Sequence, residues 1–120
     1  MNLKSFRQNP TMEELNFLFR KKWTLCILTD MHLGSKHFQD FNKNLPDIST
    51  KVLNQTLTEL EEVGLISKKI IKEKPKLTEY SLTEMGKQSK TLIKEYYGYI
   101  ARISSNSKDD EEILKRIEQL

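Results

Sequence analysis

Residues 45–83 read LPDISTKVLNQTLTELEEVGLISKKIIKEKPKLTEYSLT, and the spacing of apolar residues in this stretch changes at Gly64. Before the glycine, apolar residues recur at the three- and four-residue spacing of a helix: Val52, Leu53, Leu57 and Leu60. Ser49 offers a side-chain oxygen that can cap the start of this helix. After the glycine, segments 65–72 and 77–82 are rich in β-forming residues and flank a charged turn. This arrangement predicts a β-hairpin.

Three shorter helices are predicted before this stretch, over residues 12–20, 22–33 and 35–45. Thr11 and Glu14 have the spacing of a capping box, in which two side chains satisfy free backbone amides at a helix start. Gly34 follows the second helix, and glycine readily adopts the left-handed conformation that closes helices. Ser35 is expected to cap the third helix.

Two more helices are predicted after the hairpin. Thr83 is expected to cap a long helix that runs to Ile103, and Ser107 with Asp110 opens a last short helix. Helices followed by a two-stranded hairpin are the pattern of a winged helix-turn-helix domain, so we predict a mainly α fold (α+β) with a small β-hairpin wing. The expected organisation is a flexible arm, the winged domain and an accessory helix, over residues 1–10, 11–104 and 105–120.

The composition fits one helix-rich domain of 120 residues, with 37% hydrophobic and 31% charged residues and only four glycines. A single cysteine excludes an internal disulfide, and with two histidines it argues against a zinc module. The chain has neither an apolar run long enough to span a bilayer nor a secretory signal, so we expect no membrane partner and a cytoplasmic location. No nucleophile–base pair or metal motif indicates an enzyme, and we expect no catalytic residue, metal or cofactor.

The helix predicted over residues 49–63 would be the recognition helix of such a domain, with 35–45 as its supporting helix. A recognition helix enters the major groove of double-stranded DNA, and its first residues reach base edges. The first half of this helix carries hydrogen-bonding side chains: Ser49, Thr50, Lys51, Asn54 and Gln55. We expect Ser49 to contact phosphate or cap the helix, and the other four to contact base edges. The last part is acidic, and it would have to point away from phosphate.

The wing, which we define as residues 68–76, is strongly basic. Its lysines outnumber its one acid, Glu73: Lys68, Lys69, Lys72, Lys74 and Lys76. Lysines on a protruding hairpin can lie along phosphates and release counterions, which raises affinity without reading sequence. Because side chains alternate along a strand, not all five can face DNA. Lysines also protect exposed strand edges, so charge alone leaves both interpretations open.

Five motifs in order resemble those of the HxlR family, winged-helix bacterial transcription regulators related to the MarR group. The motifs are KWTLCIL at 22–28, HFQDF at 37–41, LPDISTKVL at 45–53, LTELEEVGLI at 57–66, and Pro75 with EYSLTEMG at 79–86. The first, for example, is similar to the family's KWTLLIL helix. The resemblance covers about residues 11–100 and does not extend to the last helix.

The resemblance implies a homodimeric regulator that binds a pseudo-palindromic operator. Family members dimerise mainly through the N-terminal helix and the long helix after the wing, which correspond to residues 11–20 and 84–103. The interface residues expected from this correspondence are Leu15, Leu18, Phe19, Tyr96, Tyr97, Ile100 and Ile103. Aromatic residues are favoured at such interfaces. The resemblance leaves room for an unknown small-molecule effector.

The chain departs from the family at the cysteine that many members carry just before the first helix. Residues 9–11 read NPT here, so sensing through that thiol is not expected. Cys26 lies between apolar residues, where burial would keep a thiol unreactive. The alternative function is a winged-helix module that binds a protein instead of DNA, and the glutamates late in the recognition helix favour it slightly.

Overall fold

A computed structural model of the chain describes residues 9–105 and 108–120. The elements in order are α2 (Met12–Phe19), α3 (Thr24–His32), α4 (Phe38–Asn44), α5 (Thr50–Glu62), β1 (Ile66–Glu73), β2 (Lys76–Leu82), α6 (Glu84–Lys87), α7 (Ser89–Ile103) and α8 (Lys108–Glu118). The two strands form an antiparallel sheet. The predicted fold class, mainly helical with one β-hairpin, is therefore confirmed.

The structure contains the hydrogen bonds and glycine conformations predicted at the ends of several helices. Thr11 Oγ1 accepts the Glu14 amide at 3.1 Å, and Glu14 Oε1 accepts the Thr11 amide at 3.0 Å, which completes the capping box before α2. Ser49 Oγ accepts the Val52 amide at 3.1 Å and caps α5. Gly34 and Gly64 have φ angles of 114° and 84°, the left-handed conformation expected where α3 and α5 end.

The start of α4 differs from the prediction, because Ser35 does not cap it. The N-cap is His37, and the Asp40 carboxylate accepts the amides of Lys36 and His37 at 3.0 and 2.9 Å. These backbone hydrogen bonds lower the pKa of Asp40, since they stabilise its charged form. Ser35 is buried and donates its hydroxyl to Asp30 instead, at 2.7 Å.

The single helix predicted over 84–103 is wrong in one respect, since it is divided at Gln88 into α6 and α7. The Gln88 amide donates to Met85 O, three residues back, at 3.2 Å, which is a tighter turn than the α-helical one. The Ser89 hydroxyl donates to Gly86 O at 2.6 Å and takes up that carbonyl at the break. The predicted cap of α8 at Ser107 lies outside the described residues.

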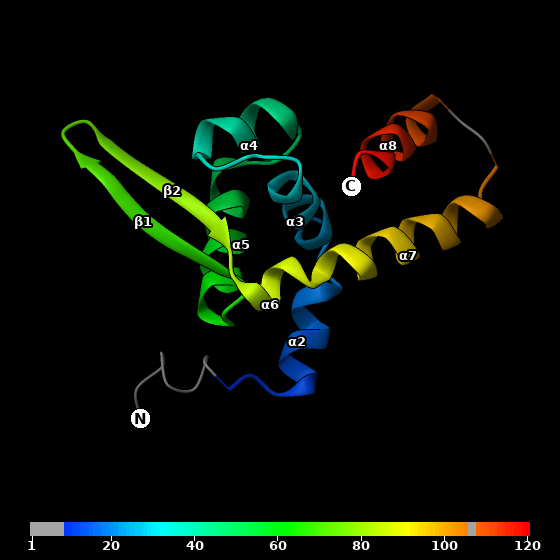
Figure 1. Ribbon diagram of the computed structural model, residues 1–120, viewed down its shortest axis with the longest axis horizontal. Helices are drawn as coiled ribbons and strands as arrows, with labels where there is room; N and C mark the ends of the chain where they lie inside the picture. Colours follow the sequence, from blue (N-terminus) through cyan, green and yellow to red (C-terminus); the bar gives the residue numbers. More distant parts are fainter. Residues whose placement is uncertain (1–8, 106–107) are drawn as a thin grey trace.

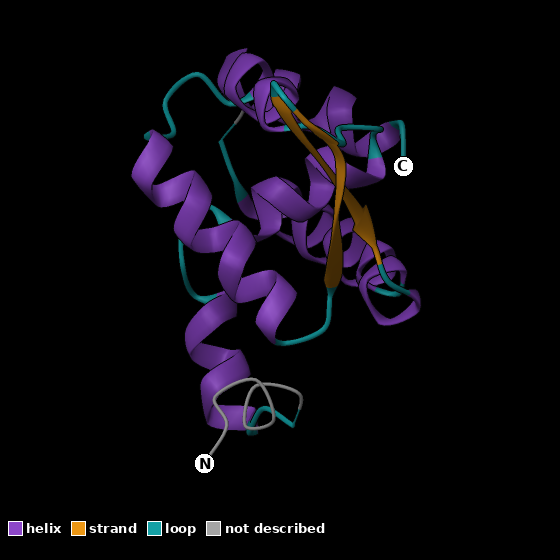
Figure 2. Ribbon diagram, turned by 90° about the vertical axis from the view of Figure 1, so that its left-hand side faces the viewer, coloured by secondary structure: helices purple, strands orange, loops and turns teal. Residues whose placement is uncertain are grey.

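The core gathers around α3, which lies between α4 and α5 on one side and α7 on the other (Figure 1). Its Ile27 and Leu28 are fully buried with Phe41 of α4, Leu53 of α5 and Ile93 of α7. The hairpin projects from this body at one end, and α8 lies beside α7 at the other (Figures 1 and 2). Among the described residues, no helix combines the length and the apolar character needed to cross a membrane.

Candidate nucleic-acid interface

One face of α5 is anchored in the core and the opposite face is open. Leu53, Thr56, Leu57 and Leu60 are buried. The five side chains predicted to reach DNA are all exposed: Ser49, Thr50, Lys51, Asn54 and Gln55. They lie at or near the N-terminus of the helix, where free amide groups favour a negatively charged partner such as phosphate.

The acidic end of α5 is partly neutralised within the protein. The Glu59 carboxylate accepts two hydrogen bonds from Lys21 Nζ, at 2.6 and 2.8 Å. Lys21 follows α2, so this ion pair ties the N-terminal helix to the C-terminal half of α5. Glu59 therefore has a structural partner, and the charge at this end of the helix is lower than the sequence suggests.

The strand register sorts the wing lysines by face. Lys68 lies opposite Tyr80, and Lys69 lies opposite Glu79. Directly opposite residues project from the same side of a sheet, so Lys68 shares the face of the buried Tyr80 ring and Lys69 lies on the other face. A register shift at Ile71 forms a β-bulge before the turn.

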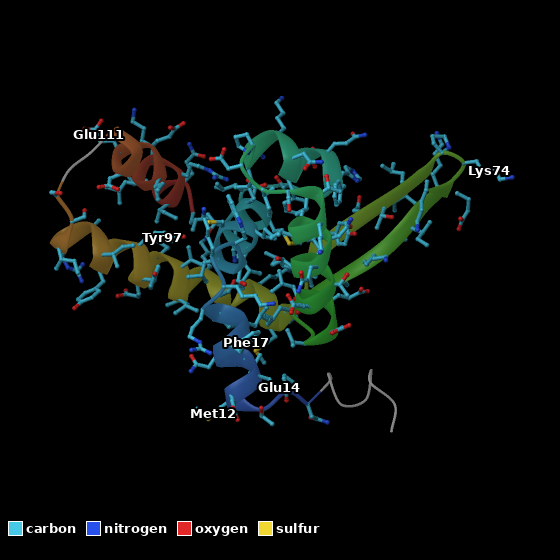
Figure 3. The ribbon with its side chains drawn as sticks, turned by 180° about the vertical axis from the view of Figure 1, so that it is seen from behind. Met12, Glu14, Phe17, Lys74, Tyr97 and Glu111 are labelled. Atoms are coloured by element: carbon cyan, nitrogen blue, oxygen red, sulfur yellow. The ribbon has the colours of Figure 1, made fainter. Side chains whose placement is uncertain are left out.

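The wing lysines also differ in their cross-strand neighbours. Lys69 faces Glu79 and Lys76 faces Glu73, so an acid lies opposite each of them. Three lysines have no acid opposite: Lys68 faces Tyr80, Lys72 faces Leu77, and Lys74 lies in the turn. All five are exposed, and Lys74 is at the far end of the hairpin (Figure 3). Lys68, Lys72 and Lys74 are consequently the cations with the least local compensation.

Two hydrogen bonds attach the hairpin to the start of α4. The Tyr80 amide donates to Lys36 O at 2.7 Å, and His37 Nδ1 donates to Thr78 O at 3.0 Å. A carbonyl oxygen only accepts, so Nδ1 carries the proton. The Tyr80 ring packs edge-on against Phe41, with the ring centres 6.4 Å apart. Burial, with the nearby Glu61 charge, raises the pKa of Tyr80.

His37 is a residue whose contact with the hairpin the sequence did not indicate, because its partner is remote along the chain. It lies 41 positions before Thr78, and only the paired hairpin brings the two together. The two bonds to β2 fix the hairpin relative to the supporting helix α4.

The residues predicted for a dimer interface have unequal exposure. Ile103 is 70% exposed and Tyr96 is also exposed, whereas Leu15, Phe19, Tyr97 and Ile100 are half-buried. Leu18 is only 4% exposed, because it packs into the core of its own chain. Several exposed apolar residues lie outside the predicted set: Met12 and Phe17 on α2, and Leu92 and Tyr99 on α7. Met12 and Phe17 project from α2 in Figure 3.

Cys26 is half-buried, and its Sγ lies 3.9 Å from the hydroxyl of Tyr97. Burial, with the neighbouring thiol, raises the pKa of Tyr97. A cavity of about 70 Å³ adjoins this pair, and another of about 100 Å³ lies between α7 and α8. Both are lined by Tyr97 and Ile113.

The two histidines are engaged separately. His32 Nε2 lies 2.9 Å from Ser89 Oγ, while His37 binds the hairpin. Burial, with the charge of Lys90, lowers the pKa of His32. Residues 9–105 and 108–120 contain no group of three or more His, Cys, Asp or Glu side chains placed to hold a metal ion.

Comparison with known proteins agrees with a helix-turn-helix domain that carries a hairpin. The HxlR-like helix-turn-helix family model matches residues 18–108. The HTH-type transcriptional regulator YvaP of Bacillus subtilis, itself uncharacterized, is 34% identical over 86 residues, which are 72% of this chain and 80% of YvaP.

Two solved structures extend the likeness to three dimensions. The reduced form of the transcriptional regulator YodB of Bacillus subtilis has 30% identity and a TM-score of 0.65, covering 76% of this chain and 89% of that one. A MarR-family transcriptional regulator of Porphyromonas gingivalis W83 has 29% identity and a TM-score of 0.64, covering 77% and 90%. The resemblance found in the sequence is thus confirmed: the chain belongs to the HxlR-like helix-turn-helix family, whose relatives named here are transcriptional regulators.

Proposed function

We propose that this protein is a transcriptional regulator that binds a pseudo-palindromic DNA operator as a homodimer, with one α5 helix in each half-site. The observation that carries the proposal is the exposed, polar N-terminal half of α5 beside a projecting, lysine-rich wing. A helix and a wing held in this relation can read the major groove and follow the adjacent phosphates.

Within this proposal the polar residues of α5 divide into two roles. The Ser49 hydroxyl oxygen already accepts a hydrogen bond as the cap of the helix. Its hydrogen can still be donated to a phosphate oxygen. Thr50, Asn54 and Gln55 contact base edges as hydrogen-bond donors or acceptors, and Lys51 contacts them as a donor only. The wing contributes affinity, and Lys68, Lys72 and Lys74 supply most of it.

Substitution of Asn54 by alanine tests base reading. We expect the preference at one base position in each half-site to fall by about 1–3 kcal/mol, because one pair of base-edge hydrogen bonds is lost. The measurement is selection of duplexes from a random library by wild type and variant, followed by titration. The control is Thr58→Ala, one turn farther along the exposed face, which should keep the wild-type preference. Equal losses for the selected and a shuffled duplex with Asn54→Ala would remove Asn54 from the base-reading set.

The dimer is supported by apolar side chains that the folded chain leaves uncovered on α2 and α7. Ile103, Tyr96 and Tyr99 are exposed along α7, and an open hollow of about 650 Å³ lies along α2 beside Met12 and Leu15. A second copy would bury these surfaces, as aromatic and aliphatic groups at interface centres usually are. Leu18 is left out of the proposed interface, because its side chain is already in the core.

A charge placed in this surface should separate the protomers. We expect Ile103→Glu to weaken dimerisation by about 30-fold or more, since a carboxylate would be buried opposite apolar groups. Sedimentation analysis over a dilution series measures this change. Ile71→Glu, which places the same charge at an exposed isoleucine of the hairpin, should leave the dimer intact. A wild-type protein that sediments as a monomer at all concentrations would refute the dimer.

A second candidate function has one specific observation in its favour. Ile70 and Ile71 are exposed on the hairpin, among the lysines, although DNA offers few apolar contacts there. A winged-helix module that binds an acidic, partly apolar protein surface would use such a combination. This alternative predicts no measurable affinity for duplex DNA even at low salt.

A further inference from the structure

A buried carboxylate connects both ends of the supporting helix α4. Asp30, on α3, is 1% exposed. Its Oδ2 accepts from Ser35 Oγ at 2.7 Å, just before α4, and from Asn44 Nδ2 at 3.4 Å, at the last residue of α4. Asn44 Nδ2 also donates to Ser35 Oγ at 3.0 Å, which closes the network. Asp30 therefore ties the two ends of α4 to α3.

The charge of this carboxylate is balanced from the far end of the chain. Arg116 Nη2 of α8 donates to Asp30 Oδ1 at 2.5 Å, across 86 positions of sequence. A buried carboxylate is costly unless it is paired and hydrogen-bonded. Among the ion pairs described, this one joins α8 to the helix-turn-helix body, and Ile117 of α8 is buried beside it.

We infer that Arg116 is a positioning residue: docking of α8 fixes the placement of α4 through Asp30, and α8 and the DNA-binding surface are thereby coupled. Without the guanidinium, Asp30 retains only neutral donors. The buried carboxylate then lacks a charged partner, and the rearrangement that compensates for this loss alters its bonds to Ser35 and Asn44. The ends of α4 thereby lose a fixed attachment.

The effect on DNA follows from the short connection between α4 and α5. Only residues 45–49 separate the two helices, and the start of α4 also holds the hairpin through Lys36 and His37. A shift of α4 therefore changes the relation between α5 and the wing. This consequence rests on the proposed function, whereas the coupling of α8 to α4 does not.

Hydrogen exchange in α4 tests the coupling directly. We expect Arg116→Met to raise amide exchange over residues 38–44 about tenfold, a typical size for coupling between distant sites. Lys115→Met removes the same charge from the adjacent, exposed position and should leave α4 unchanged. Arg116→Lys, which keeps a charge within reach of Asp30, should recover most of the protection. Unchanged exchange in α4 with Arg116→Met would overturn the inference.

Asp30→Asn distinguishes this coupling from simple loss of α8 packing. With no buried charge to balance, Arg116→Met should change α4 exchange by less than about twofold in that background. If Arg116→Met raised α4 exchange as much in the Asp30→Asn background as in the wild type, α8 would act through its apolar contacts. That result would overturn the role of Arg116.

The effect on function is tested by measuring the affinity of each variant for the selected duplex, at a temperature where all variants are folded. We expect about tenfold weaker binding for Arg116→Met and wild-type binding for Lys115→Met. Faster exchange in α4 with unchanged DNA affinity would overturn the link to DNA. If the wild type bound no duplex at all, the proposed function would fail, and the exchange result would still decide whether Arg116 holds α4.

Discussion

Replacing Gly86 by alanine is expected to destabilise the fold by about 3 kcal/mol or more, at the upper end of the range for overpacking. A Cβ at this position would lie 1.9 Å from the carbonyl oxygen of Leu65 and 3.3 Å from a methyl group of Leu82. The first of these atoms belongs to the backbone, so it cannot turn aside as the end of a flexible side chain could. The extra methyl group must push α6 away from the start of the hairpin.

The displaced contact lies at the junction that orients the wing. Leu65 O also accepts the Thr83 amide at 3.1 Å, and Thr83 Oγ1 donates to Gly64 O at 2.6 Å. These bonds join the end of α5 to the base of both strands. We therefore expect Gly86→Ala to lower DNA affinity as well as stability, because the wing loses its fixed base.

Gly98→Ala is the matched control, since it adds the same methyl group to a helical glycine of α7. The nearest atom to its added Cβ is Arg102 Nη1, at 3.9 Å, the end of a flexible side chain. Alanine favours the helix over glycine by about 0.5–1 kcal/mol, so this variant should be slightly more stable than wild type. Urea denaturation of both variants measures the difference. Similar stabilities would contradict the close packing of Gly86 on Leu65.

Removal of the three uncompensated wing lysines should have the largest effect on DNA binding. For Lys68, Lys72 and Lys74 together changed to alanine, we expect the slope of log affinity against log salt to fall by about 0.9 per contact, or about 2.7 in all. Affinity near 0.1 M salt should fall by about 10²-fold or more, equally for the selected and shuffled duplexes, because phosphate contacts carry no sequence information.

A triple change elsewhere controls for net charge. Lys87, Lys90 and Lys94 are exposed and lie on α6 and α7, outside the hairpin. Their replacement by alanine should leave the salt slope near the wild-type value. Lys69 and Lys76 face Glu79 and Glu73. Replacing these two lysines by alanine should lower the salt slope less than replacing two of the uncompensated lysines. An unchanged slope for the triple wing variant would mean that the wing does not lie on phosphates.

The elements of the fold could be predicted because their signals are local. Thr11 with Glu14, Ser49, Gly34 and Gly64 each specify a helix end within a few residues, and the change of period at Gly64 separates α5 from the hairpin. The exposed face of α5 followed from the same periodicity. Local signals are sufficient where the deciding contacts are only three or four positions apart.

The errors arose at residues whose contacts lie outside the three- and four-residue spacing of a helix. Ser35 has the right type and place for an N-cap, but the buried carboxylate of Asp30 takes its hydroxyl. The helix after Thr83 is divided at Gln88, close to Gly86, whose close neighbour Leu65 lies 21 positions earlier. Leu18 fits the pattern of an interface residue equally well, and only the tertiary packing shows that it is in the core.

The central claim is tested most directly by titrating the wild-type protein, at about 50 and 200 mM salt, with its selected duplex and with a shuffled one. We expect the selected duplex to bind about 10³-fold tighter or more, with steep salt dependence for both. Equal binding of the two duplexes, or none at the lower salt concentration, would contradict sequence-specific recognition of DNA by α5 and the wing.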